Sequence, residues 1–284
     1  MDASFVDYPF SIFSAVPTAM EVTNVGGHCK VGEKALPDEL ESFVNSTKSK
    51  GTIIIAFGTL GRWEYAPKAT FDGVMNALKQ LTDYRVIFQY SGPEIKVPSH
   101  IKALAWLLFL WLGCLFLFLF LADILMHPKT KLFFSHGGLK SLKESICSGV
   151  PVVVLPLFAE QGFNAYNVKR LGIGEALEKT AISTERTKQT FLKILNTPSY
   201  KKRVEEFRDI FLDIMMPPLD LGVFKAEYIL RHGGMPRIFR RRGMDFNWIQ
   251  YWCLDILALI LLIFIILGIG SAKSCVYLYN NITV

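Results

Sequence analysis

Two glycine-rich turns in the sequence carry residues that could bind a phosphate. The first, Gly58-Thr59, follows the β-branched run of residues 51–57, and the second, residues 136–138, follows the apolar residues 132–134. Glycine allows a ligand to approach the backbone closely. A helical pattern follows the second turn directly, and the start of a helix directs N–H groups and a partial positive charge toward one point. We therefore expect an anion, most often a phosphate, to bind there, beside the imidazole of His136.

The segments around these turns alternate between strand and helix patterns. Strands are expected over residues 51–57, 84–90, 101–106, 132–134, 150–155 and 173–178, and helices over residues 38–46, 71–81, 139–148, 162–171, 184–195, 200–215 and 221–232. Residues 51–57 form a continuous β-branched run, which is typical of a strand buried on both faces. The alternation predicts an α/β domain with a doubly wound, mostly parallel sheet. Ligands of such sheets bind outside the carboxyl ends of the strands, where both glycine turns lie.

Composition narrows the class of protein. A chain of 284 residues can bury a core, and its net charge of +6 is mild. The clearest basic cluster is Arg237 with residues 240–242. It has neither a repeated alternation of aromatic and basic residues nor a known motif, so nucleic-acid binding is not favoured. A basic flank next to a membrane segment is the better interpretation, because an apolar segment begins a few residues later.

The five cysteines (Cys29, Cys114, Cys147, Cys253 and Cys275) are far apart and odd in number. Their spacing matches neither a disulfide framework nor a metal site. We therefore expect buried free thiols and no bound metal.

Two segments are apolar enough to cross a membrane. Residues 248–272 are apolar apart from Asp255 and have aromatic residues at one end, followed by Lys273 and Tyr277 at the other, which predicts a transmembrane helix. Residues 103–122 contain no charge, but they lie between one predicted strand and the helix leading to the next. A span there would split the sheet, so we do not expect one.

Residues 133–161 resemble the signature of the UDP-glycosyltransferases, specifically the animal UDP-glucuronosyltransferase type. The pattern is H-x-G-x-x-S-x-x-E, then G-V-P, then P-L-F and an acidic residue followed by Gln. This sequence has His136, Gly138, Ser141, Glu144, residues 149–151, residues 156–158 and Glu160-Gln161 at those places. The resemblance covers nearly the whole chain. It implies the Rossmann-like, C-terminal donor-binding half of a two-domain GT-B fold, followed by a membrane anchor.

The resemblance also implies roles for individual residues. His136 would hydrogen-bond a donor phosphate, with Gly137 and Gly138 allowing close approach and Ser141 part of the same motif. Thr59 would lie near the phosphates. Glu144 would accept hydrogen bonds from the ribose hydroxyls, and Trp106 would stack on uracil. Glu160 and Gln161 would bind the sugar hydroxyls.

Three departures from the family pattern stand out. Lys140 replaces a common Asn, and Glu160 replaces the usual Asp. The family's W-x-P-Q-x-D-L-L-x-H-P is interrupted after Trp106, and its Pro-Gln is gone. We interpret residues 108–121 as an apolar insertion that arises from translated non-coding sequence or a gene-model error.

The family transfers a sugar from a UDP donor to a small lipophilic acceptor with inversion, and the general base, a His supported by an Asp, belongs to its N-terminal domain. The resemblance places that base outside this chain, so the catalytic residues here are unknown. It implies UDP-glucuronate or UDP-glucose as co-substrate, no further cofactor, and an oligomer with related transferases.

Three interpretations remain open. The chain is an incomplete form of a membrane-anchored transferase, or a short, catalytically inactive donor-binding membrane module that associates with full-length relatives. The third, a two-span membrane protein without enzymatic role, requires residues 103–122 to be a span.

The expected organisation has five parts. Residues 1–21 are a remnant of an N-terminal domain or linker, residues 22–235 the UDP-sugar-binding domain, residues 236–247 a basic juxtamembrane loop, residues 248–272 the transmembrane helix and residues 273–284 a short tail. The family location implies a single-pass protein of the endoplasmic reticulum with its main domain in the lumen. The basic residues 240–242 would favour the opposite orientation.

Overall fold

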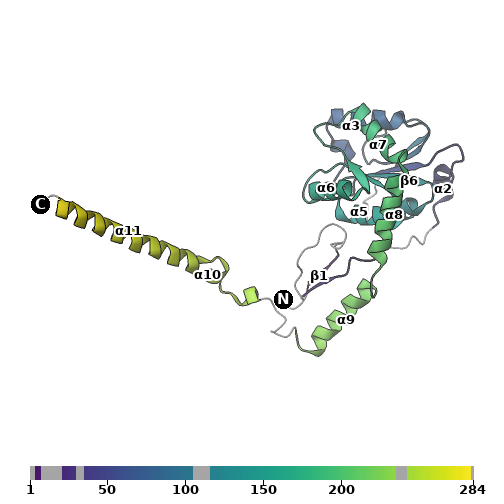
Figure 1. Cartoon of the computed structure of the whole chain (residues 1–284). Coiled ribbons are helices and arrows are strands. Elements are labelled where there is room, and N and C mark those ends of the chain that lie inside the picture. The colour runs from purple at the N-terminus through teal and green to yellow at the C-terminus, as the bar shows by residue number, and fades with distance from the viewer. Residues whose placement is uncertain (1–3, 8–20, 30–34, 105–115, 235–241, 283–284) are drawn as a thin grey trace. The chain divides into compact units, whose positions relative to one another are not determined.

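A computed structural model describes residues 4–7, 21–29, 35–104, 116–234 and 242–282. Its centre is a six-stranded parallel sheet in the order β5-β4-β3-β6-β7-β8 (Figure 1). The strands are β3 (Thr52–Ala56), β4 (Arg85–Gln89), β5 (Ile101–Leu104), β6 (Thr130–Ser135), β7 (Val152–Val154) and β8 (Gly174–Ala176). The predicted doubly wound parallel sheet is confirmed.

Helices cover both faces of this sheet. They are α2 (Asp38–Val44), α3 (Lys68–Lys79), α4 (Phe116–Met126), α5 (Leu139–Ser148), α6 (Gln161–Leu171), α7 (Thr184–Leu195) and α8 (Pro198–Leu212), with α9 (Pro218–Arg231) following. Successive side chains of a strand point to opposite faces. Accordingly Ile53 and Ile55 join one buried cluster, whereas Ile54 joins the other.

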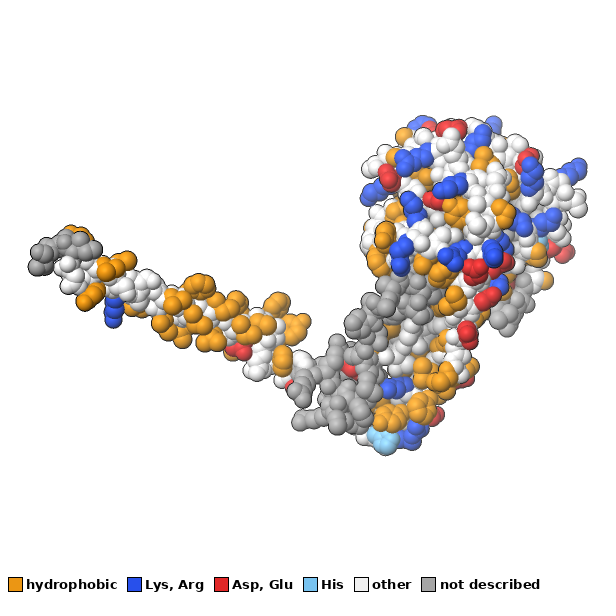
Figure 2. All heavy atoms as spheres, in the orientation of Figure 1, with side chains coloured by type: hydrophobic (Ala, Val, Ile, Leu, Met, Phe, Trp, Pro, Cys, Tyr) orange, Lys and Arg blue, Asp and Glu red, His pale blue; other side chains and the backbone are white. Residues whose placement is uncertain are grey.

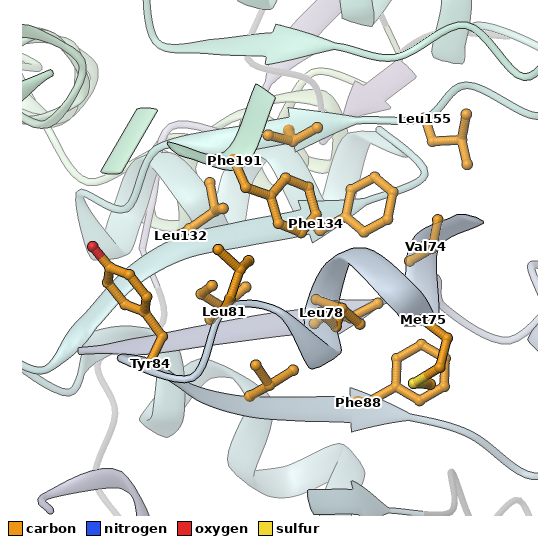
Figure 3. Packing of buried hydrophobic residues seen from close by; sticks show 14 of the residues in the cluster. Val74, Met75, Leu78, Leu81, Tyr84, Phe88, Leu132, Phe134, Leu155 and Phe191 are labelled. Carbon is orange, nitrogen blue, oxygen red and sulfur yellow. The ribbon is translucent and has the colours of Figure 1, made fainter. Parts of the chain in front are cut away.

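The first cluster lies under α3 and α7, and its members pack closely (Figure 3). Phe134 of β6 and Phe191 of α7 meet edge to face, with ring centroids 5.1 Å apart. The second cluster lies under α2, α4, α5, α6 and α8. All of β3, and β6 apart from Lys131, is buried between the two clusters, which holds the carboxyl ends of both strands in place.

The order of the strands reverses between β3 and β6. After β3 the chain forms β4 and then β5, each on the outer side of the strand before it. After β6 it forms β7 and then β8 toward the opposite edge of the sheet. The helices that follow these two strands, α3 after β3 and α5 after β6, lie on opposite faces of the sheet. Ligands of such sheets bind at this switch point, outside the carboxyl ends of the strands. Both glycine turns predicted to bind phosphate lie there.

The prediction of buried free thiols is wrong for the four cysteines that the structure describes, since two are bonded to each other and the other two are free but exposed. Cys29 and Cys147 form a disulfide, with their Cα atoms 5.4 Å apart across a sequence separation of 118 residues. The pairing joins the segment before α2 to α5, and only the tertiary fold brings these distant positions together. Cys253 and Cys275 are free and exposed, and Cys114 lies outside the described residues.

The predicted apolar insertion is described in part. Residues 105–115, which include Trp106, lie outside the described residues. Residues from 116 onward form α4, which ends with Ile124 and Leu125 buried against α5 and the sheet.

The predicted C-terminal span is divided into two helices. A short helix α10 (Trp248–Tyr251) has an Asn247–Gln250 capping box, and the left-handed backbone of Cys253, with φ of +54°, separates it from α11 (Leu254–Ile282). In the described part of the chain, residues Leu254–Asn281 of α11 form the one helix long and apolar enough to cross a membrane. Its surface is largely hydrophobic (Figure 2). The helix therefore includes most of the segment predicted as a tail.

A two-stranded sheet of β1 (Ser4–Val6) and β2 (Val22–Asn24) lies near the start of the chain, and a 3-10 turn (Arg242–Asp245) precedes α10.

Candidate functional site

The two glycine turns come together around His136. Ala56 at the end of β3 pairs with Ser135 at the end of β6, so the residues that follow are neighbours. A Cβ atom added to Gly58 would lie 3.2 Å from His136 Cε1, and one added to Gly138 would lie 2.4 Å from His136 Nε2. The imidazole thus lies between two glycines, and a side chain at either position would meet its ring.

The turn after β6 requires glycine at its second position. Gly137 has φ of +79°, and a Cβ atom there would lie 2.3 Å from a methyl carbon of Val154. Its N–H donates to Ser135 Oγ at 3.3 Å, and its carbonyl oxygen accepts a 2.9 Å hydrogen bond from the side-chain amide of Asn164 on α6. The neighbouring strand and helix therefore fix this turn.

The turn after β3 is fixed by a second amide. Gln89, at the end of β4, accepts a hydrogen bond from the Phe57 N–H at 2.7 Å and donates one to the Gly58 carbonyl oxygen at 2.9 Å. Both backbone groups flank the position where a phosphate would approach. Thr59 follows directly and its side chain is exposed.

The surroundings of the partly buried His136 favour its neutral imidazole. Burial lowers the pKa of its imidazole, and the carboxylate of Glu160 offsets part of that shift. Ser135 Oγ lies 3.4 Å from Nδ1. A neutral imidazole still donates one hydrogen bond, which suits an anionic oxygen.

The N-terminus of α5 adds to this environment. Gly138 is its N-cap, and no side chain caps the helix. The first N–H groups of a helix have no partner within the helix and carry partial positive charge. Phosphate oxygens can therefore meet the helix end and the imidazole together.

Glu144 lies farther along α5 and lines a cavity. The cavity has a volume of about 180 Å³, and its lining includes His28, Lys140 and Lys143. Lys143 Nζ donates to Asp7 Oδ1 at 2.8 Å and lies 3.5 Å from His28 Nε2. Ala122 and Met126, which follow residues 105–115, form part of the wall.

The loop between β7 and α6 carries the two predicted sugar-binding residues. Glu160 is exposed, whereas Gln161 is buried and its side-chain oxygen accepts from the N–H groups of Leu157 and Phe158 at 2.8 and 3.2 Å. Ala159 has a left-handed backbone, with φ of +53°. Such strain in a residue other than glycine is common at functional loops.

The structure thus brings some of the predicted residues together and separates others. His136, Gly137, Gly138 and Glu160 lie at one place, next to Gly58 and Thr59. Glu144 lines a cavity farther along α5, Ser141 is buried on α5, and Trp106 lies outside the described residues. Within the described residues, no three His, Cys, Asp or Glu side chains are grouped as a metal site.

Sequence reasoning missed the two amides that hold the turns. Gln89 ends an otherwise apolar strand, and Asn164 lies on the buried face of α6. A polar side chain at the end of a buried strand, or on the apolar face of a helix, is the signal that could have indicated them.

Comparison with known proteins identifies similar chains. A model of the family described as UDP-glucoronosyl and UDP-glucosyl transferase matches residues 5–284. A UDP-glucuronosyltransferase of Pleuronectes platessa is 32% identical over 92% of this chain and 53% of its own length. Human UDP-glucuronosyltransferase 1A9 is 30% identical over 97% of this chain and 48% of its own length. The chain therefore spans about half the length of these relatives.

Solved structures with the same fold are glycosyltransferases. The glycotransferase of kitacinnamycin matches with a TM-score of 0.60 at 15% identity, over 79% of this chain and 54% of that one. The calicheamicin glycosyltransferase CalG4 matches with a TM-score of 0.58 at 17% identity, over 81% and 53%. At this identity the likeness establishes the fold, which is that of one half of a GT-B glycosyltransferase.

Proposed function

Because this chain belongs to the UDP-glucoronosyl and UDP-glucosyl transferase family, we propose that it binds a UDP-sugar at the two glycine turns. The observation that carries the proposal is the convergence of Gly58, Gly138 and the N-terminus of α5 on the neutral imidazole of His136. The diphosphate lies over this point. His136 donates to one of its oxygens, and Thr59 contacts it from the other turn.

The rest of the donor extends to either side. The ribose reaches Glu144, whose carboxylate accepts from its hydroxyls, and Trp106 stacks on the uracil. The sugar lies against the loop of Glu160, whose exposed carboxylate accepts from sugar hydroxyls. Gln161 holds the shape of that loop through Leu157 and Phe158. The UDP-sugar is a co-substrate, and we propose no additional cofactor.

The transferred sugar is glucuronate. Support comes from the relatives, which are named UDP-glucuronosyltransferases. Transfer to a small lipophilic acceptor inverts the anomeric carbon, with a general base that takes the acceptor's proton. We expect that base in the part of the relatives that this chain does not span.

The location we propose is a single-pass membrane protein of the endoplasmic reticulum, with the donor-binding domain in the lumen. Helix α11 supplies a candidate anchor. The Cys29–Cys147 disulfide supports the luminal side, because disulfides persist in oxidising compartments and are rare in the cytosol. Protease protection in sealed microsomes tests this: cleavage of the donor-binding domain without detergent would refute it.

Calorimetric titration of the full chain in lipid nanodiscs tests donor binding. Uridine, UDP, UDP-glucose and UDP-glucuronate are titrated in turn. We expect UDP to bind at least about tenfold more tightly than uridine, because charge-assisted hydrogen bonds to phosphate contribute about 1.5–3 kcal/mol each. UDP-glucuronate should bind more tightly than UDP-glucose. Equal affinities for uridine and UDP would refute the phosphate site, and equal affinities for the two sugars would refute glucuronate selectivity.

A further inference from the structure

An apolar cavity lies beside the candidate donor site. It has a volume of about 460 Å³, within the range of about 300–1,000 Å³ that is typical of small-molecule pockets. It lies where the loops after β3 and β7 meet the segment after β8. Most of its wall is hydrophobic, including Phe57, Leu60, Trp63, Tyr65, Leu157 and Phe158.

Several of the hydrophobic side chains that line the cavity are exposed to solvent. Leu60 and Tyr65 are 77% and 75% exposed, and Phe158 is 50% exposed. Large hydrophobic side chains gathered around a hollow at the surface indicate a binding site. Trp63 is different: it is buried and packs against Phe57 with ring centroids 4.7 Å apart, so the floor of the cavity is rigid.

The two cationic side chains in the lining are engaged with neighbours. The Arg62 guanidinium donates to Glu64 Oε1 at 2.6 Å and lies 4.9 Å from the centre of the Tyr65 ring. Lys179 Nζ donates to the Leu157 carbonyl oxygen at 3.5 Å. The cavity therefore suits a neutral apolar ring better than an anion.

The cavity lies close to the candidate donor site. The Phe57 ring, one wall of the cavity, lies 6.2 Å from the His136 ring, centroid to centroid. Leu157 and Phe158, on another wall, are the residues whose N–H groups Gln161 holds. The cavity and the predicted sugar-binding residues thus share one loop. A molecule bound here lies next to the sugar end of the donor.

We propose that this cavity binds the apolar ring of a small, neutral lipophilic molecule, and that the donor-binding domain thereby takes part in selecting the acceptor. The proposal rests on the proposed function. The ring fills the space between Phe57, Leu60 and Phe158, and its hydroxyl extends toward the loop of Glu160.

Photolabelling tests this inference. The full chain in nanodiscs is irradiated with a phenol that carries a trifluoromethyl-diazirine, with and without excess 1-naphthol, and the labelled peptides are mapped by mass spectrometry. We expect label in residues 57–67 and 155–158, and we expect 1-naphthol to abolish it. Label spread evenly over the exposed apolar surface, or label that 1-naphthol does not reduce, would overturn the proposal.

Matched variants make the test specific. Thr70→Trp places an indole at the cavity wall from the first turn of α3, whereas Asn76→Trp places the same group at an exposed position of the same helix. Labelling should be lost in the first variant and kept in the second. Leu60→Ser removes an exposed apolar side chain from the cavity lining without disturbing the core, and it should weaken labelling.

UDP titration of the same samples separates the two proposals. Wild-type chain that binds UDP but shows no protectable label refutes the cavity alone. Wild-type chain that does not bind UDP refutes the proposed function.

Discussion

Gln89 holds Gly58 in place from the neighbouring strand. Its side-chain nitrogen donates to the Gly58 carbonyl oxygen at 2.9 Å, while its oxygen accepts from the N–H of the preceding residue, Phe57, at 2.7 Å. One amide thus satisfies two backbone groups at the carboxyl end of β3. Residue Gln89 of β4 therefore fixes the conformation of the first glycine turn. We expect a substitution of Gln89 to lower the affinity of the candidate donor site.

We predict that Gln89→Leu destabilises the protein by about 2–4 kcal/mol, because each buried backbone group left unpaired costs about 1–3 kcal/mol. Urea unfolding followed by circular dichroism measures this. Gln80→Leu, at an exposed position where the side chain accepts from Lys188, is the control and should change the free energy of unfolding by less than about 0.5 kcal/mol. UDP affinity of the folded Gln89→Leu variant should also fall. Unchanged stability would show that the turn keeps its shape without this amide.

Ala159 carries backbone strain next to the predicted sugar-binding residues. Its φ of +53° is costly for a residue with a Cβ atom, by about 1–2 kcal/mol, and glycine relieves that cost. Ala159→Gly should therefore stabilise the protein by about 0.5–1 kcal/mol after the larger entropy of glycine in the unfolded chain is counted. Ala181→Gly, at a loop residue without positive φ, should instead destabilise it slightly. A loss of stability in Ala159→Gly equal to that of the control would contradict the strain.

The Cys29–Cys147 disulfide closes a long loop, with 118 residues of sequence separation. Such a cross-link restricts the unfolded chain, and its removal costs about 2–5 kcal/mol. The double variant Cys29→Ser/Cys147→Ser should be destabilised by that amount, whereas Cys253→Ser/Cys275→Ser, which changes exposed free thiols, should not. Non-reducing peptide mapping of the native protein should recover the 29–147 pair. Alkylation of both thiols without prior reduction would contradict the pairing.

The buried imidazole of His136 should make stability depend on pH. Burial lowers its pKa in the folded protein below the ordinary value of 6.5. Between these two values the unfolded chain binds a proton that the folded protein does not, so stability falls as the pH drops below about 6.5. The wild type should therefore lose more stability than His136→Gln between pH 7.5 and 5.5. Equal losses in thermal melts of the two proteins would contradict this assignment.

The sequence predicts the central elements well, because their signals are local. The β-branched run of β3, the apolar face of α5 and the spacing of α7 each determine one element, and the observed bounds of α5 and α7 match the expected ones. Strands β7 and β8 are shorter than the expected ranges 150–155 and 173–178, because pairing with the neighbouring strand ends before burial does.

Other features depend on contacts that no local pattern reveals. Cys29 and Cys147 are 118 residues apart in the sequence, and only the tertiary fold brings them together. Likewise, Gln89 and Asn164 acquire their roles from turns on other strands, at Gly58 and Gly137. The break at Cys253 is a backbone feature within an apolar run, where hydropathy is uniform. The contacts that hold the two glycine turns therefore required the structure, whereas the position of the turns at the ends of β3 and β6 could be predicted from the sequence.

Titration of the full chain with UDP, before and after His136→Ala, tests the central claim most directly. Loss of one hydrogen bond to phosphate should weaken UDP binding about tenfold to a hundredfold. His232→Ala, which removes an exposed histidine of the segment after α9, should leave the affinity unchanged. Equal UDP affinity in wild type and His136→Ala would contradict a phosphate site at the two glycine turns.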